Sequence, residues 1–188
     1  MTGDDRRKQK ISIVILAYPF ALLFTAAGLN WFVFGVERAV VSIPVPPVVA
    51  VLVMSAVLLL ANHSWLMTST ELVRLRHNIK ATPEEWQASD FRREDVLDEG
   101  KDELERQHNA HRNATENTVY FVFLALLMGM VSPVVVAAQI WIIGFAVGRL
   151  GHTFSYLSGN DSARGLSMSI SLLSLYGLAS YLALALVV

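Results

Sequence analysis

Long blocks of apolar residues, separated by short polar segments, make up most of this chain. The blocks lie at 11–36, 45–72, 118–131, 134–157 and 166–188. A helix needs about 20 predominantly apolar residues to cross a bilayer, and the block at 118–131 gains length from the polar stretch that it continues. The blocks lack the alternation of barrel strands, and only helices or closed barrels satisfy their backbone in lipid. The pattern predicts an all-α, polytopic membrane helical bundle with five spans.

Composition agrees with this class of protein. Of the 188 residues, 54% are hydrophobic, against about 45–50% in soluble domains, and the length suits one domain. The chain has no cysteine, which excludes disulfides, thiolate metal sites and a cysteine nucleophile of its own. No basic patch is interleaved with exposed aromatic residues, so nucleic acid is not an expected partner.

The basic start before the first block is also typical of a cleaved signal peptide. The block at 11–36 is too long for the apolar core of such a peptide, and no clear small-residue cleavage site follows it. We therefore interpret it as a true span. The chain then divides into a basic N-terminus with an extra transmembrane helix, 1–42, and a four-helix membrane domain, 43–188, with a polar loop at 74–107.

The distribution of lysine and arginine predicts the orientation. These residues lie before the first span, between the second and third, and between the fourth and fifth, whereas the other side keeps only Arg38. Because basic loops stay in the cytoplasm, we expect a cytoplasmic N-terminus, a cytoplasmic loop 74–107 and a C-terminus on the opposite side. Within that loop, Thr82, Pro83 and Glu85 are typical of a helix start.

Two stripes of polar residues lie toward the charged ends of the third and fourth spans. Their i, i+3, i+4, i+7 spacing puts each stripe on one helix face. The stripes consist of Asn109, Arg112, Asn113 and Glu116, and of Arg149, His152, Thr153 and Tyr156. Arg149 would lie about 12 Å inside its span, where an ionised arginine costs on the order of 2.5–3.5 kcal/mol. It therefore needs a partner, and Glu116 is the nearest unassigned carboxylate.

A polar network that only joins helices is one interpretation of these stripes. Two matched stripes and a further cation, Arg164, in the adjoining loop favour a ligand site. Cations, one carboxylate, amides and a ring hydroxyl suit a zwitterion with carboxylates and an ammonium group, such as glutathione. A free thiol has a pKa near about 8.5, which neighbouring cations lower. Since the chain has no cysteine, the reactive sulfur would come from this cofactor.

A metal site made of His108, His111 and His152 is a third interpretation. The three histidines do not have the spacing of a metal motif, and Arg112 beside them would repel a cation. No metal is therefore expected.

The stretches "ERQHNAHRNATENTVYFVFLAL" and "VGRLGHTFSYL" resemble the membrane-associated proteins in eicosanoid and glutathione metabolism (MAPEG), most closely the microsomal prostaglandin E synthase branch. That branch reads E-R-x-x-R-A-H-R-N-D-x-E-x and V-G-R-x-x-H-T-x-x-Y-L there, and "LVRLR" at 72–76 also matches. The resemblance covers about 46–188. It implies a MAPEG-like four-helix protomer, a homotrimer in membrane lipid, and glutathione bound between subunits near the cytosolic face.

The resemblance also implies roles for single residues. Arg74 matches an arginine from a neighbouring subunit, and Arg164 is the best match for the arginine that stabilises the thiolate. The expected cofactor-binding residues are Arg74, Asn109, Arg112, Asn113, Glu116, Arg149, His152 and Tyr156, with Arg164 as the catalytic residue.

This chain departs from the family pattern in three places. Asn109 replaces a family arginine, which weakens one carboxylate contact unless His108 replaces it. Gly165 stands where prostaglandin E synthases have a serine that is credited with thiol activation, and Ser167 would substitute only if the loop register shifts. The span at 11–36 is extra, and we expect it on the outside of the trimer.

The sequence leaves three functions to compare. The leading one is a glutathione-dependent membrane transferase or peroxidase that acts on lipophilic electrophiles. A prostaglandin-type endoperoxide isomerase is a narrower form of it, which Gly165 disfavours. A non-catalytic lipid-binding or activator protein belongs to a different class, and absence of glutathione binding would favour it.

Overall fold

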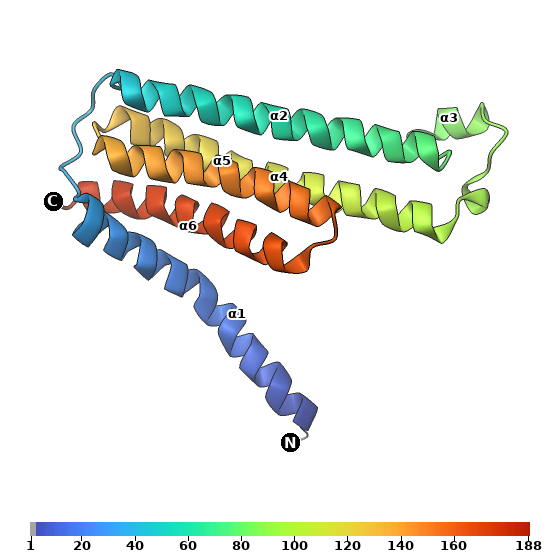
Figure 1. The fold of residues 1–188 in the computed structure, drawn as a ribbon, viewed down its shortest axis with the longest axis horizontal. Coiled ribbons are helices and arrows are strands. Elements are labelled where there is room, and N and C mark those ends of the chain that lie inside the picture. The colour runs from blue at the N-terminus through green and yellow to red at the C-terminus, as the bar shows by residue number, and fades with distance from the viewer. Residues whose placement is uncertain (1–2) are drawn as a thin grey trace.

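The computed structural model describes residues 3–188, which form helices and connecting segments without a strand (Figure 1). The helices, in order, are α1 Gly3–Gly28, the π-helix η1 Leu29–Phe34, α2 Pro46–Arg76, α3 Pro83–Gln87, the 3-10 helix η2 Arg93–Asp95, α4 Asp98–Met130, α5 Val135–Leu157 and α6 Asp161–Ala185. The prediction of an all-α membrane bundle is confirmed.

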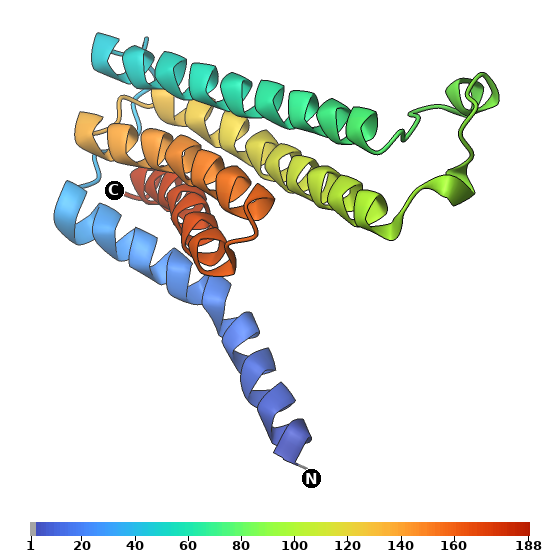
Figure 2. The ribbon, with the colours of Figure 1, turned by 45° about the vertical axis from the view of Figure 1, so that its right-hand side comes forward.

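Helices α2, α4, α5 and α6 run side by side, and α2 and α4 extend beyond the α5–α6 turn (Figures 1 and 2). Four segments are long and apolar enough to cross a membrane. They are Asp5–Phe34, Pro46–Arg76, Val135–Leu157 and Asp161–Ala185. Helix α4 is not among these four because its first half is charged, but its apolar second half packs within the bundle through Phe121, Ala125 and Met128.

The start of α6 differs from the sequence expectation. A loop was expected through Gly165, but the helix begins at Asp161 because Asn160 caps it, with its Oδ1 accepting a hydrogen bond from the Ala163 amide at 3.0 Å. Arg164 therefore lies on the first turn of α6 rather than in a loop. The expected cap in the 74–107 loop is confirmed, since the Glu85 amide donates to Thr82 Oγ1 at 3.3 Å.

Helices α5 and α6 approach closely because glycines of one face serines of the other. A Cβ at Gly144, Gly148 or Gly151 would lie within 2.7 Å of the hydroxyl oxygen of Ser174, Ser171 or Ser167 respectively. Small residues allow such close contact between membrane helices. This contact fixes the position of α5, which carries the second polar stripe.

Helix α1 with η1 is joined to the bundle by apolar contacts and by the fully buried side chain of Asn30. Its Nδ2 donates to the Gly177 carbonyl at 2.8 Å and to Ser180 Oγ at 2.9 Å, and its Oδ1 accepts from Trp141 Nε1 at 2.8 Å. Residues 5–18 of α1 are exposed, and this part diverges from the bundle N-terminal of Pro19 (Figure 2). The extra helix is therefore anchored mainly at one end.

We expect Asn30→Ala to destabilise the protein by about 2 kcal/mol, because the substitution leaves the Trp141 N–H buried without a partner. Thermal unfolding in detergent would show a lower midpoint, and α1 would be cleaved more readily in limited proteolysis. Phe32→Ala is the matched control, since Phe32 is exposed in the same helix. Equal midpoints for the two variants would contradict this anchoring role.

Candidate functional site

The charged half of α4 presents the first polar stripe to two different sides of the molecule. Asp98 and Glu99 in its first turn favour the helix start, because carboxylates stabilise a helix N-terminus. Asn113 points toward α5, whereas Arg112 and Glu116 are exposed on another flank. Within a single chain, Asn113 therefore contacts α5 without Arg112 or Glu116, while Asn109 and Arg112 line one hollow. That all four residues bind one cofactor stays a prediction.

The centre of the second stripe is Arg149 on α5, which is fully buried. Its Nη2 donates to Asn113 Oδ1 at 2.6 Å and lies 3.2 Å from Nδ1 of His152, and its Nη1 is 3.5 Å from the Met168 sulfur. The buried guanidinium has no carboxylate partner within residues 3–188. We call Arg149, Asn113 and His152 the buried arginine cluster.

The prediction that Glu116 pairs with Arg149 is wrong for the single chain. Asn113, one turn closer to the start of α4, occupies the place of the expected carboxylate. Glu116 is exposed, where its charge keeps contact with solvent or a partner. An amide can accept the hydrogen bond of Arg149, but it leaves the positive charge of the guanidinium without a counter-ion.

A second group of expected residues lines a hollow of about 510 Å³ at the charged end of the bundle. Asn109, Tyr156 and Arg164 reach it from α4, α5 and α6, and Asp102, Glu105 and Arg106 complete its polar wall. We call it the terminal hollow. Its walls carry charges of both signs, which suits a zwitterionic ligand, and its volume lies in the range of about 300–1,000 Å³ typical of ligand pockets.

Arg164 is held beside the terminal hollow by two contacts. Its guanidinium carbon lies 5.0 Å from the centre of the Tyr156 ring, and its Nη2 forms an ion pair with Asp161 at 3.1 Å. The Tyr156 ring in turn lies 5.7 Å from the His152 ring. The buried arginine cluster and the terminal hollow are therefore connected through one pair of aromatic side chains.

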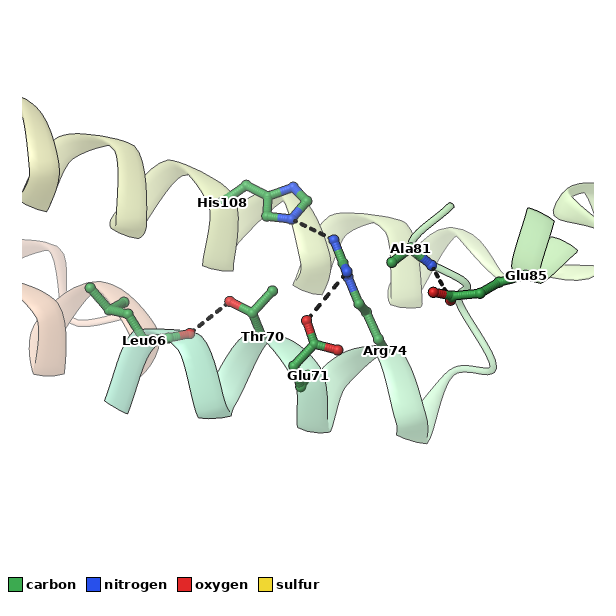
Figure 3. Close-up of polar contacts among 7 residues, drawn as sticks. All are labelled: Leu66, Thr70, Glu71, Arg74, Ala81, Glu85 and His108. Atoms are coloured by element: carbon green, nitrogen blue, oxygen red, sulfur yellow. Dashed lines mark hydrogen bonds and ion pairs between the residues drawn. The ribbon is translucent and has the colours of Figure 1, made fainter. Parts of the chain in front are cut away.

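The other flank of α4 carries the remaining expected residues. Arg74 at the end of α2 extends between Glu71 and His108, with its Nη1 3.3 Å from Glu71 Oε1 and its Nη2 3.5 Å from His108 Nε2 (Figure 3). Arg112 and Glu116 line an open hollow of about 410 Å³ together with His108, His111 and Thr115. We call this the flank hollow.

The two sides of α4 thus each hold part of the expected site. Asn113, Arg149, His152, Tyr156 and Arg164 lie on the α5–α6 side, and Arg74, Arg112 and Glu116 lie on the flank. Asn109 lines the terminal hollow and also a further hollow that His108 and Arg112 line. A single chain does not bring Arg74 and Arg164 to one ligand. The histidines of the metal interpretation also separate, because His111 contacts His63 with 3.2 Å between ring nitrogens, whereas His152 contacts Arg149.

Two contact residues of the site were missed in the sequence. Met168 lies four residues after Arg164, and Asp161 three residues before it, so helical spacing places all three on one face once the helix start is known. Ser167 faces Gly151 on α5, so the register shift that would bring it to the position of Gly165 is absent. A Cβ at Gly165 would meet no atom within 4 Å.

We expect His108 to remain neutral at pH 7, because desolvation and then the cations Arg74 and Arg112 hold its imidazole pKa below 6.5. In the unfolded chain, the imidazole has its ordinary pKa of 6.5 and binds a proton more readily than in the folded chain. The free energy of unfolding should therefore decrease through His108 as the pH falls below 6.5. NMR titration of the His108 ring, assigned with His108→Gln, would measure the pKa. A value at or above 6.5 would contradict this arrangement.

Two comparisons with known proteins give the same relationship. The family model described as MAPEG family matches residues 51–184. The prostaglandin E synthase of Equus caballus is 35% identical over 91 residues, which make up 47% of this chain and 56% of that protein. The chain therefore spans just over half the length of this relative. No solved structure matches the chain.

Proposed function

The chain belongs to the MAPEG family, and on this basis we propose that it is a glutathione-dependent membrane transferase or peroxidase for lipophilic electrophiles. The terminal hollow is the observation that carries the proposal. It places Asn109, Tyr156 and Arg164 around one space at the charged end of an integral membrane bundle. A water-soluble cofactor can reach this end, while an apolar substrate reaches the bundle from the bilayer.

The polar groups of the chain fit the chemistry of glutathione. Arg149 Nε, Arg74 Nε and Thr153 Oγ1 are buried without a hydrogen-bond partner within residues 3–188. Two of them are donors on cationic residues expected to bind the cofactor, and unpaired buried donors favour a bound acceptor such as a carboxylate. Asp102 and Glu105 in the terminal hollow offer partners for an ammonium group.

Bound glutathione would supply a thiolate that forms a carbon–sulfur bond with an electrophile as a leaving group departs. In the peroxidase reaction, two glutathione molecules would together reduce a hydroperoxide to an alcohol and water and become a disulfide. The residues of the chain would set the charge of that sulfur. Arg164 is exposed enough to touch a ligand, and its guanidinium favours a thiolate over a thiol beside it. The Tyr156 ring contacts the Arg164 guanidinium through its face, and its hydroxyl can donate a hydrogen bond to the ligand.

The separation of Arg74, Arg112 and Glu116 from the terminal hollow supports a homotrimer. In a symmetric assembly, the flank of one copy can face the terminal hollow of the next, which would complete a site that one chain leaves in two parts. Chemical cross-linking in nanodiscs, read as the mass of the largest discrete species, tests this arrangement. A monomer that binds glutathione with full activity would rule it out.

We also propose that the charged end of the bundle, with the N-terminus and the segment 74–107, faces the cytoplasm. The C-terminus then lies on the other side, and the chain divides at about residue 42 into the extra helix and the four-helix domain. Cysteine labelling of this naturally cysteine-free chain, at Lys101 and at Val188 in separate variants, would report the side of each position.

Three measurements on the purified protein in nanodiscs test the function together. They are calorimetry of glutathione binding, ultraviolet absorbance of the thiolate, and conjugation of an aryl halide. Binding with a thiolate signal and product formation is the expected result. Absence of glutathione binding would favour the non-catalytic lipid-binding class instead.

An endoperoxide isomerase is the second candidate, because the relative from Equus caballus is a prostaglandin E synthase. Both candidates need the same thiolate. They differ at Gly165, which provides no hydroxyl beside Arg164. Conversion of a lipid endoperoxide to a ketone-alcohol without net consumption of glutathione would support this candidate over the first.

A further inference from the structure

A further hollow lies between α2 and α4 and adjoins the flank hollow at Thr115. Its volume is about 440 Å³, and its lining is mainly apolar, with Leu59, Ala114, Val119 and Val122 among the residues. We call it the lateral hollow. Asn62, on its α2 side, lies about 21 Å along the helix axis from Arg76, which places it well inside the membrane span.

Asn62 is the feature of this hollow that packing does not explain. The residue is only 4% exposed, and its side-chain amide forms no hydrogen bond with another group of residues 3–188. The two threonines of the hollow already donate within α4, Thr115 to the His111 carbonyl at 3.0 Å and Thr118 to the Ala114 carbonyl at 2.8 Å. An unpaired amide inside a membrane is unfavourable. A ligand with a polar group would give this amide a partner.

Along α4, the lateral hollow adjoins the flank hollow. Thr115 lines both the lateral hollow and the flank hollow, where Arg112 and Glu116 lie. At the junction, His63 of the lateral hollow contacts His111 of the flank hollow with 3.2 Å between ring nitrogens. A molecule in the lateral hollow would therefore have its polar end near the charged groups of α4.

We propose that the lateral hollow binds a lipid-phase molecule with an apolar body and one carbonyl or hydroxyl group, and that Asn62 forms a hydrogen bond with that group. The volume and apolar lining fit a segment of acyl chain, and the amide distinguishes such a molecule from a plain hydrocarbon. Only one part of this inference rests on the proposed function, namely that the bound molecule is the lipophilic electrophile.

The test uses the full chain in phosphatidylcholine nanodiscs with a photoreactive palmitic acid as the probe. After irradiation, mass spectrometry maps the labelled residues, and unlabelled palmitic acid or hexadecane is added as competitor. We expect labelling at residues 59–63 and 114–122 that palmitic acid reduces at least about fivefold, with hexadecane less effective. Labelling of the exposed part of α1 should not respond to either competitor.

Two tryptophan substitutions form a matched pair. Val119 lines the lateral hollow and is 64% exposed, so Val119→Trp can fill the space without disturbing the core. Leu60 is also 64% exposed but lies outside the hollow, so Leu60→Trp controls for an added ring at the lipid surface. We expect competable labelling to fall at least about fivefold in the first variant and to stay unchanged in the second.

Asn62→Leu tests the polar contact itself, because leucine has nearly the same volume without the amide. Loss of one neutral hydrogen bond should weaken competition by palmitic acid about fivefold, to the level of hexadecane. Unchanged competition in this variant would overturn the proposal. So would labelling spread evenly over the lipid-facing surface, or a cross-link from position 119 to a second copy, which would show that protein fills the hollow.

Glutathione calorimetry in the same nanodiscs separates this inference from the proposed function. Competable labelling without glutathione binding would sustain the lateral site and reject the proposed transferase or peroxidase. Glutathione binding without competable labelling would reject the lateral site alone.

Discussion

Replacing Gly148 with valine is expected to abolish the close contact between α5 and α6 and with it most of the folded protein. A Cβ at this position would lie 2.8 Å from the Ser171 backbone nitrogen and 3.0 Å from the Ser167 carbonyl oxygen. Backbone atoms within a helix cannot change position independently, as a flexible side chain can. The added side chain would therefore force α5 and α6 apart. Overpacking of this kind costs about 3 kcal/mol or more.

Gly165→Ala is the matched control for this substitution, because its Cβ would meet no atom within 4 Å. The measurements are the yield of monodisperse protein in detergent and its unfolding midpoint. We expect the control to match the unmodified chain. A Gly148→Val protein with normal yield and midpoint would show that α5 and α6 do not need this close approach.

The second large effect is expected at Arg164. Arg164→Gln should lower the rate of aryl halide conjugation about 100-fold, the order seen when one group that stabilises a developing or full negative charge is removed. The thiolate absorbance of bound glutathione should fall in parallel, because the thiol pKa returns toward its free value of about 8.5. Stability should change little, since the ion pair of Arg164 with Asp161 is exposed.

Two further variants separate charge from local structure. Asp161→Asn breaks the same ion pair but keeps the cation, and it should retain most of the activity. Arg164→Lys keeps the charge and should recover part of the thiolate signal. If Arg164→Gln conjugates at the normal rate, Arg164 has no role in activating the sulfur, and the cation must be sought in the buried arginine cluster or on the flank.

The sequence predicted the helices well because long apolar blocks have few alternatives in a membrane. It misplaced the start of α6, because "SGNDSARG" contains the small and polar residues of a loop, while a single capping side chain, Asn160, is enough to begin a helix. This error also assigned Arg164 to a loop rather than to the first turn of α6.

The candidate site was only partly predictable. Helical spacing correctly joined Asn113 to the side of Arg149, but it also joined Arg112 and Glu116, which are exposed and line the flank hollow. A stripe with i, i+3, i+4, i+7 spacing is wide enough to contact two neighbouring helices. The periodicity of the sequence does not indicate which of its residues contacts which helix. The tertiary contacts of Asn30 with Trp141 and Gly177 had no local signal at all.

The contacts of Asn30 set an order for biogenesis. Its acceptor on α6 and its donor on α5 lie 147 and 111 residues later in the chain. The side-chain amide of Asn30 therefore has none of these partners until α5 and α6 have been translated. A chain that ended before α5 would leave this amide without those partners in the lipid, which is unfavourable.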